Sequence, residues 1–303
     1  MYTQPIKRTV FACLLSSFAA LLLSCAGIAQ AIGDSADEMG DSRAARALSQ
    51  SAHSFERALG DITAEQEYFI GRAVAANLLT NYRYCNERPE LTRYLNEITA
   101  ALVVNSSEPE LYNGYHAAIL DNLEVNAFAT PGGHIFITQG LLDCVSSEDT
   151  LAAVIAHEIA HIQLQHSIKA IKTNRVINAI SDTTLSIAAL TGVLDEAAIE
   201  IVTTLHDGYA ESQEFAADTL ALELLAKAGY EPSSLITVLE ALKKNQRSTS
   251  GGFNKTHPAP DERIAKLERP LRQYGHKAPD ADTRTYREAR YNAVKSWAFH
   301  SPQ

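Results

Sequence analysis

The sequence predicts a mainly α-helical domain with a small β-sheet, an α+β fold. Apolar residues recur at helical spacing through most of the segment 63–270, which is typical of amphipathic helices packed on a core. The segment 115–138 differs, because its short runs alternate apolar and polar residues around a Pro-Gly-Gly turn. With 303 residues, 46% of them hydrophobic, the chain can bury a substantial core, and one main domain is expected.

Residues 1–31 have the pattern of a secretory signal peptide. Lys7 and Arg8 precede a long apolar run that ends in a small-x-small cleavage pattern. An uncleaved membrane anchor is the alternative, since the run is near the lower length limit for crossing a bilayer. A third interpretation rests on the stretch from Leu22 to Cys25, which resembles the site where bacterial lipoproteins are cut and acylated. It would give the protein a lipid anchor at Cys25 and associate it with a membrane.

The rest of the chain is acidic. Residues 32–62 are small, polar and acidic, and we expect a flexible leader there. Removing residues 1–31 takes away two basic and no acidic residues, so 24 Lys and Arg remain against 36 Asp and Glu, a net charge of −12. Such a charge disfavours nucleic acid and anionic lipid as partners.

Two cysteines, Cys85 and Cys144, lie in the body of the chain. An even number of cysteines in an oxidising compartment suggests a disulfide between them. Two buried thiols are the alternative, because the sequence does not measure their separation.

The helices before the metal-binding motif have recognisable starts. Thr63 and Gln66 have the spacing of a capping box and begin the first helix. Pro89 suits the first turn of the second. After the small sheet, the hydroxyl of Ser146 or Ser147 is expected to cap the third helix.

The second half of the chain is also mostly helical. Residues 176–207 are apolar, but acidic residues interrupt them, so amphipathic helices are expected there instead of a membrane span. Another helix ends at Gly229, and the next follows Pro232. Residues 271–303 form a polar C-terminal extension with one helix near residues 283–297.

Two histidines and a glutamate form an HExxH motif. His157 and His161 lie one turn apart on one helix face, so both imidazoles can bind a single ion, with Glu158 beside them. A catalytic zinc needs a third protein ligand and an open position for water. Glu214 would supply that ligand, and Asp218, one turn on, would accept the outer N–H of a ligand histidine. The alternatives are two structural histidines and a solvated acidic helix face.

Four segments, in this order along the chain, resemble one known family. They are NAFATPGGHIFITQGLL at 126–142, HEIAH at 157–161, the two acids of EFAAD at 214–218, and THPAPDERI at 256–264. Together they look like the gluzincin metallopeptidases, which include the CAAX prenyl proteases, the membrane protease HtpX and their soluble or lipidated periplasmic relatives. The resemblance covers about residues 63–270 and implies a zincin-like metallopeptidase domain there.

The resemblance also implies the roles of the site residues. His157, His161 and Glu214 would bind one Zn²⁺ per chain, Glu158 would be the catalytic acid/base, and Asp218 would support a ligand. Zinc makes water more acidic and polarises a carbonyl, so Glu158 would take a proton from water and return it to the leaving amine. Since no interior membrane span is expected, the periplasmic branch of the family is implied.

The edge of the small sheet is the expected place for a substrate. An extended peptide can add there as a strand, through backbone hydrogen bonds that do not depend on its sequence. Asn126 and the turn formed by Pro131, Gly132 and Gly133 are the candidate rim of this site. An ordinary hairpin is the alternative.

These observations favour a zinc endopeptidase of the bacterial periplasm or cell envelope. Substrates held by their backbone would be unfolded or misassembled envelope proteins, so the expected role is protein quality control. A chaperone-like binding module on the same scaffold, without turnover, is the main alternative, although the intact Glu158 argues against it. A lipid-anchored structural protein would bind no stoichiometric zinc.

Five further residues have weaker assignments. His257, in a loop that the resemblance places near the site, is a candidate fourth ligand that would hold the enzyme latent, or else only a histidine at the start of a helix. Arg263 is expected to anchor that helix through an ion pair. His166 lies about 140° round the helix from the second motif histidine and should not bind the same ion. His134 and Tyr209 are candidates for stabilising the oxyanion.

Overall fold

The computed structural model describes residues 62–171, 187–245, 257, 259–274 and 279–298, so the predicted signal peptide and almost all of the predicted leader lie outside the described residues. Most of the described residues are helical and one small sheet is present, which confirms the predicted fold class. The elements are α4 (Ala64–Leu78), α5 (Pro89–Val103), β1 (His116–Leu120), β2 (Ala127–Thr130), η1 (Pro131–Gly133), β3 (His134–Thr138), α6 (Gln139–Cys144), α7 (Glu148–Gln163), η2 (Ile168–Ala170), α9 (Ile187–Asp207), α10 (Glu211–Lys227), α11 (Ser234–Asn245), α13 (Pro260–Tyr274) and α14 (Ala281–Ala298).

Local hydrogen bonds determine where the first helices begin. Thr63 Oγ1 accepts from the N–H of Gln66 at 3.2 Å, and Gln66 Oε1 accepts from the N–H of Thr63 at 2.8 Å, so the predicted capping box is confirmed. Pro89 is the first residue of α5. Of the two candidate caps of α7, Ser147 is used, because its Oγ accepts from the N–H of Thr150 at 3.2 Å.

The sheet has three strands in the order β1-β3-β2. β1 pairs with β3 in parallel, and β2 pairs with β3 antiparallel. The outer edge of β1 is closed by a side chain of α5: Asn96 Nδ2 donates to the carbonyl of Ala117 at 2.8 Å, and Asn96 Oδ1 accepts from the N–H of Ala117 at 2.9 Å. β2 forms the opposite edge of the sheet, beside α7.

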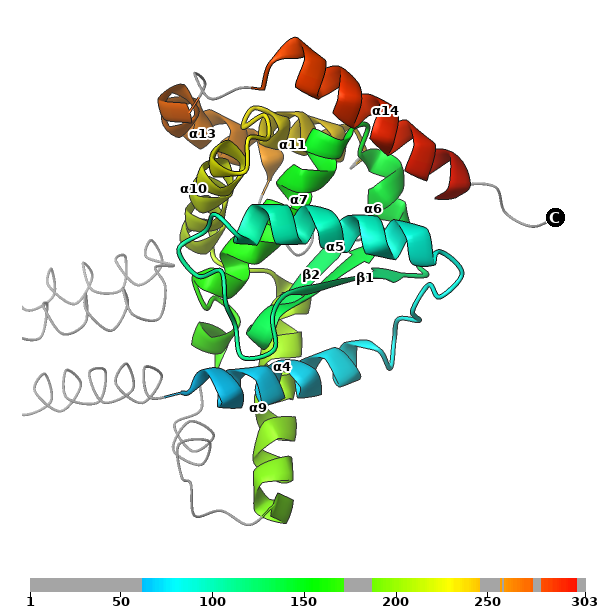
Figure 1. The fold of residues 1–303 in the computed structure, drawn as a ribbon. Helices are drawn as coiled ribbons and strands as arrows, with labels where there is room; N and C mark the ends of the chain where they lie inside the picture. The colour runs from blue at the N-terminus through cyan, green and yellow to red at the C-terminus, as the bar shows by residue number, and fades with distance from the viewer. Residues whose placement is uncertain (1–61, 172–186, 246–256, 258, 275–278, 299–303) are drawn as a thin grey trace, which may run out of the picture.

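The sheet separates two hydrophobic clusters, because successive side chains of a strand point to opposite faces. Ile135 and Ile137 of β3 belong to the larger cluster, with α5, α7, α10 and α11, whereas Phe136 belongs to a smaller one with α4 and α9. Figure 1 shows α5 on one side of the sheet and α4 and α9 on the other. Every residue of α7 is buried, so the helix that carries the HExxH motif is the central helix of the domain.

The Pro-Gly-Gly turn is packed beneath α4, which contradicts its assignment as an exposed substrate rim. Pro131, Gly132 and Gly133 are buried, and Asn126 is only 1% exposed. A β-carbon at Gly71 of α4 would lie 1.7 Å from the carbonyl oxygen of Pro131, so only glycine lets the helix approach this closely. The turn therefore joins α4 to the sheet and does not face a substrate.

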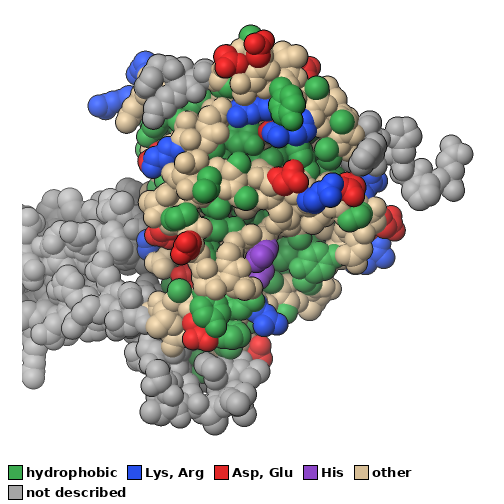
Figure 2. All heavy atoms as spheres, viewed as in Figure 1, with side chains coloured by type: hydrophobic (Ala, Val, Ile, Leu, Met, Phe, Trp, Pro, Cys, Tyr) green, Lys and Arg blue, Asp and Glu red, His purple; other side chains and the backbone are tan. Residues whose placement is uncertain are grey.

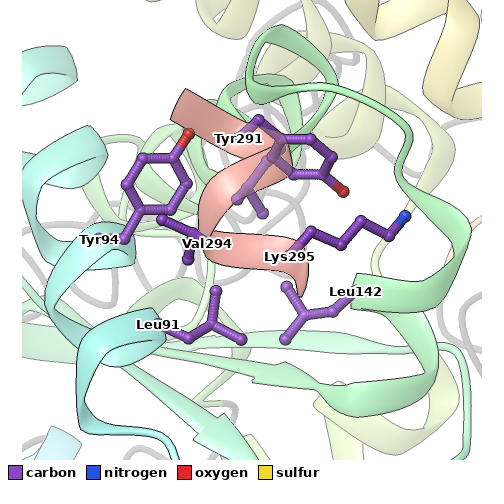
Figure 3. A pocket seen from close by; sticks show the side chains of 7 residues that line it. Leu91, Tyr94, Leu142, Tyr291, Val294 and Lys295 are labelled. Atoms are coloured by element: carbon purple, nitrogen blue, oxygen red, sulfur yellow. The ribbon is translucent and has the colours of Figure 1, made fainter. Parts of the chain in front are cut away.

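The predicted C-terminal helix is present as α14 and packs on the main body. It lies across α5 and α7 (Figure 1), and Tyr291 donates its hydroxyl hydrogen to the carbonyl of Val145 at 2.8 Å. Figure 3 shows the small pocket that remains under this helix, with Leu91 and Tyr94 of α5 facing Tyr291 and Val294 of α14. The described helix of the extension thus packs on the folded domain.

The predicted disulfide is contradicted by the structure. Cys85 and Cys144 are thiols that are not joined to each other. The Cys85 sulfur accepts from Gln139 Nε2 at 3.3 Å, whereas the Cys144 thiol donates to the carbonyl of Gly140 at 3.2 Å, one turn back along its own helix. Each sulfur is therefore directed to a different partner.

The surface combines charges of both signs. Figure 2 shows acidic and basic side chains scattered among apolar ones over one face of the molecule. Among the described helices, none combines the length and the apolar composition needed to cross a membrane. α9 is the part of the predicted amphipathic segment 176–207 that the structure describes. It does not meet these criteria for a membrane span, and it packs against α4.

Candidate metal centre

Two neighbouring helices bring the predicted ligands together. His157 and His161 project from α7, and Glu214 projects from the first turn of α10, which lies alongside α7 (Figure 1). Nε2 of His157 lies 3.1 Å from Nε2 of His161 and 3.5 Å from Glu214 Oε2, and Nε2 of His161 lies 3.4 Å from Glu214 Oε1. Bonds of about 2.0–2.2 Å to zinc place tetrahedral ligands about 3.3–3.6 Å apart. The two separations that involve Glu214 fall in this range and the 3.1 Å between the histidines lies just below it, so the cluster has the dimensions of a site for one tetrahedral metal ion.

The unsatisfied polar atoms of the cluster also fit a metal site. Among the described residues, Oε1 of Glu158 and Oε2 of Glu214 are buried and make no hydrogen bond. A buried carboxylate oxygen without a hydrogen bond is costly, so such an atom indicates a ligand or a reacting group. Glu214 Oε2 still lies within ion-pair distance of His157 and Arg263, so the Glu158 oxygen is the clearer sign. Burial raises the pKa of Glu158 to about 7, which keeps its carboxylate able to exchange a proton near neutral pH.

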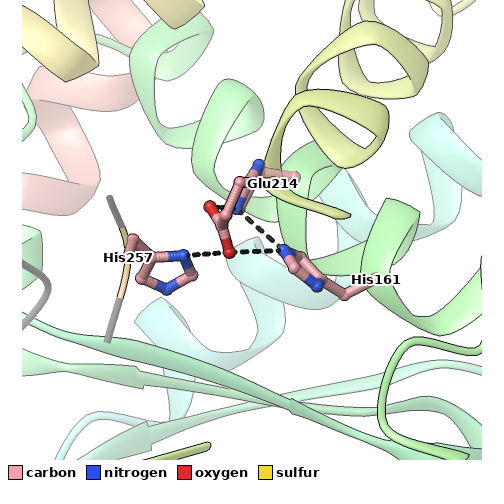
Figure 4. Close-up of side chains that lie close together, drawn as sticks. His161, Glu214 and His257 are labelled. Atoms are coloured by element: carbon pink, nitrogen blue, oxygen red, sulfur yellow. Dashed lines mark hydrogen bonds and ion pairs between the residues drawn. The ribbon is translucent and has the colours of Figure 1, made fainter. Parts of the chain in front are cut away.

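His257 completes a group of four potential ligands. Its Nδ1 lies 2.7 Å from Glu214 Oε1, and Figure 4 shows its ring facing Glu214 on the side opposite His161. One ligand atom from each of His157, His161, Glu214 and His257 lies within 4.8 Å of the others. The histidine is 6% exposed, so the structure places it inside the site and not at its rim.

Asp218 and Arg263 form a buried ion pair behind the cluster. Asp218 Oδ1 lies 3.0 Å from Nδ1 of His157, the outer nitrogen of that ligand. Arg263 donates to both carboxylate oxygens of Asp218, at 2.6 and 2.8 Å, and its Nη1 lies 3.3 Å from Glu214 Oε2. Although burial opposes it, Arg263 lowers the pKa of Asp218 to about 2, so the carboxylate stays charged.

From the sequence, Arg263 is expected only to anchor its helix. The structure shows that it also neutralises two acidic residues of the site. The signal that could have revealed this was the excess of acidic groups: two buried carboxylates beside a metal need a compensating cation.

The two ligand histidines have different electrostatic surroundings. Burial and Arg263 disfavour the charged form of His157, but its hydrogen bonds to Asp218 and Glu214 outweigh them and raise its pKa to about 9. Burial lowers the pKa of His161 to about 4. Because only a neutral imidazole binds a metal, metal binding at His157 is expected to release a proton.

Of the two candidate oxyanion groups, Tyr209 lies against the cluster and His134 lies outside it. The Tyr209 ring stacks on His161, with centroids 4.3 Å apart, and its hydroxyl is hydrogen-bonded to Ser167 Oγ at 2.6 Å. His134 stacks on Tyr68 and is not among the clustered ligands of the described residues. His166 is also outside that group, but its Nδ1 lies 3.0 Å from the outer nitrogen of His161, a contact that the helical spacing does not predict.

Residues 89–271 match the sequence profile of peptidase family M48. This range includes both helices of the metal centre and the segment that holds His257 and Arg263. The chain belongs to peptidase family M48. The resemblance to the gluzincin metallopeptidases is thereby confirmed, and α4 and α14 lie outside the range that defines the family.

Characterised M48 peptidases are similar to parts of this chain. The beta-barrel assembly-enhancing protease of Escherichia coli (strain K12) is 28% identical over 192 residues, which are 58% of this chain and 38% of that protein. The metalloprotease LoiP of the same strain is 29% identical over 181 residues, 59% of this chain and 69% of LoiP. The mitochondrial metalloendopeptidase OMA1 of Schizosaccharomyces pombe is 26% identical over 219 residues, 71% of this chain and 64% of that enzyme. The chain thus spans about two fifths of the first of these relatives.

Proposed function

We propose that this M48 protein is a zinc-dependent endopeptidase that binds one Zn²⁺ per chain. The observation that carries the proposal is the triangle formed by Nε2 of His157, Nε2 of His161 and the Glu214 carboxylate, with the Glu158 carboxylate buried beside it. Two histidines and one glutamate are a common ligand set for catalytic zinc, and they leave one position open.

Each residue of the site has a defined task in peptide hydrolysis. A bound zinc ion makes water more acidic and polarises the peptide carbonyl. Glu158 takes the proton from the attacking water and returns it to the departing amine, for which its raised pKa is suitable. Asp218, held by Arg263, keeps the proton of His157 on Nδ1 and so directs Nε2 at the metal.

The outer edge of β2 is the proposed binding surface for the substrate backbone. Among the described residues β2 is an edge strand, and it packs on α7, the helix that carries Glu158. Its four residues are buried, so substrate binding at this edge requires a local rearrangement. Recognition through the backbone suits unfolded chains of many sequences. We therefore propose unfolded or misassembled proteins as substrates, without the Pro-Gly-Gly turn as a contact.

The bacterial cell envelope is the proposed location. The signal peptide predicted at residues 1–31, or a lipid anchor at Cys25, would bring the enzyme to the periplasm. One relative is a beta-barrel assembly-enhancing protease. By this analogy we propose a role in quality control of envelope proteins.

His257 is proposed to hold the enzyme latent. Its ring is buried against Glu214, where it would occupy the position that water and substrate need. Displacement of this histidine would then open the site. His257→Ala should raise the rate of casein cleavage, whereas an unchanged or lower rate, with zinc content unchanged, would reject latency.

The proposed activity is tested by comparing the wild type with Glu158→Gln. Zinc per chain is measured by atomic absorption, and casein cleavage is measured on the same samples. We expect about one zinc in both proteins and cleavage only in the wild type, because the amide cannot accept the proton of water. Equal cleavage by both proteins would refute the role of Glu158.

The remaining outcomes identify the other classes of function. Zinc binding without cleavage by the wild type and by His257→Ala would favour the chaperone-like module. A wild type without zinc would favour the structural protein and reject the peptidase.

A further inference from the structure

His157 and His161 have different partners on the nitrogen that faces away from the ligand cluster. Nδ1 of His157 lies 3.0 Å from a carboxylate oxygen of Asp218. Nδ1 of His161 lies 3.0 Å from Nδ1 of His166, a second imidazole. His166 is only 3% exposed, so water does not replace this contact. One ligand is therefore held by a carboxylate and the other by a histidine.

The positions of the nitrogen atoms determine which ring donates. Nε2 of His161 faces Nε2 of His157 at 3.1 Å and Glu214 Oε1 at 3.4 Å, so this nitrogen is the one that presents its lone pair to a metal. A neutral imidazole carries a single N–H, which must then be on Nδ1 of His161. The only role left for Nδ1 of His166 in this contact is that of the acceptor.

A tight turn after α7 brings His166 to this position. The N–H of His166 donates to the carbonyl of His161 at 3.0 Å, and the N–H of Gln165 donates to the carbonyl of Ile162 at 2.9 Å. These two bonds define a Schellman motif, in which the chain reverses through one left-handed residue. The turn thus fixes the backbone of His166 against the backbone of His161.

The left-handed residue of this turn is Gln165, with φ of 53°. Glycine is the usual residue at this place, because a β-carbon is disfavoured in the left-handed conformation. α10 ends in the same motif and has the expected residue there, Gly229, with φ of 75°. The turn after α7 is therefore strained, whereas its counterpart after α10 is not.

Two side-chain hydrogen bonds stabilise the strained turn. Gln165 Nε2 donates to Glu67 Oε2 of α4 at 3.1 Å, and Lys169 Nζ donates to the carbonyl of Leu164 at 2.8 Å. A glycine would remove the strain but also the contact with Glu67. Strain that the surrounding structure maintains beside a metal ligand indicates a functional constraint.

We propose that His166 is a positioning residue for the metal ligand His161. Its Nδ1 accepts the Nδ1–H of His161, which fixes the tautomer and the ring orientation of that ligand. Loss of such an outer partner typically lowers metal affinity about 10–100-fold. The inference rests on the zinc site proposed above and adds a residue that does not itself touch the metal.

The test separates hydrogen bonding from packing with two variants of the full chain. His166→Phe keeps a ring of similar size and removes the acceptor, whereas His166→Asn keeps an acceptor near the place of Nδ1 and leaves a larger void. Zinc dissociation constants are measured by competition with a chromophoric chelator. We expect about 10–100-fold weaker binding for His166→Phe and a smaller loss for His166→Asn. If His166 acted only by packing, His166→Asn would lose more zinc affinity than His166→Phe, because it leaves the larger void.

Two controls make the result decisive. His206→Phe, on α9 and outside the cluster, should leave zinc affinity unchanged, and melting of the zinc-free proteins reports folding separately. If His166→Phe does not fold, His166→Leu replaces it with the same expected order.

The inference would be overturned if both variants lost the same zinc affinity, or if His166→Phe bound zinc more tightly than His166→Asn. Either result would leave the proposed function standing. A wild type that binds no zinc would instead overturn the proposed function and the inference with it.

Discussion

Replacing Arg290 by alanine should destabilise the protein by about 2 kcal/mol, because Arg290 joins α14 to the first turn of the metal-binding helix. Its partner, Glu148 of α7, is fully buried. Arg290 Nε donates to Glu148 Oε2 at 2.7 Å, and Nη2 donates to Oε1. The hydroxyls of Tyr94 and Tyr230 also donate to this carboxylate, at 2.6 and 3.1 Å.

The magnitude follows from what would remain around Glu148. Removing one partner of a buried ion pair costs about 3–5 kcal/mol when the other charge is left alone. The Arg290 side chain is 39% exposed, and Arg287 Nε stays 3.8 Å from Glu148 Oε1, so the cost should be lower. The loss of hydrogen bonds to a charged group, about 1.5–3 kcal/mol, is the better guide. The melting temperature should then fall by about 4–8 °C.

Urea unfolding at constant pH measures the effect. Arg284→Ala is the matched control, because its ion pair with Glu231 spans 3.6 Å and its side chain is 57% exposed. It should change the free energy of unfolding by less than about 0.5 kcal/mol. If Arg290→Ala stayed within the same limit, α14 would not be docked through Glu148 and the reasoning would be wrong.

Three further substitutions test other parts of the structure. Asp218→Asn should weaken zinc binding about 10–100-fold in a chelator competition, since the charged acceptor for His157 is lost; wild-type affinity would contradict that role. Gly71→Ala should destabilise the protein, because the new β-carbon would collide with the backbone of Pro131. Ordinary overpacking costs about 1–3 kcal/mol, and we expect a larger loss here. An unchanged melting temperature would disprove the close packing. Glu67→Gln should become more stabilising as the pH rises above 4.5, the ordinary pKa of glutamate. Burial raises the pKa of Glu67 above that value, so the wild type loses stability as pH rises through the folded-state pKa, whereas glutamine does not titrate. Urea unfolding of both proteins at increasing pH checks the last prediction, and a constant difference would refute it.

Much of the fold was predictable because it depends on neighbouring residues. The capping box at Thr63 and the proline at the start of α5 act within one helical turn. The alternation of Ile135, Phe136 and Ile137 is enough to divide the core into two faces. Such patterns need no knowledge of the rest of the chain.

The failed predictions depend on contacts that the sequence pattern does not reveal. Cys85 accepts from Gln139 of a distant segment, whereas the Cys144 thiol donates to Gly140 one turn back in its own helix, so the two sulfurs have different partners. The Pro-Gly-Gly turn is buried because α4 carries glycine where the two backbones meet. The expected position of His166, about 140° round the helix from His161, was wrong, because α7 ends before His166 and the turn through Gln165 brings it back to His161.

The sequence by itself determined the chemistry of the centre, since the HExxH spacing places two imidazoles on one helical face whatever surrounds that helix. Only the tertiary structure decided how the centre is completed and controlled. Glu214, His257 and Arg263 come from segments far apart in the chain, and their convergence depends on how α10 and α13 pack on α7. Helix geometry follows from backbone hydrogen bonds between residues a few positions apart. The meeting of Glu214, His257 and Arg263 depends instead on how helices from distant parts of the chain bury their side chains against each other.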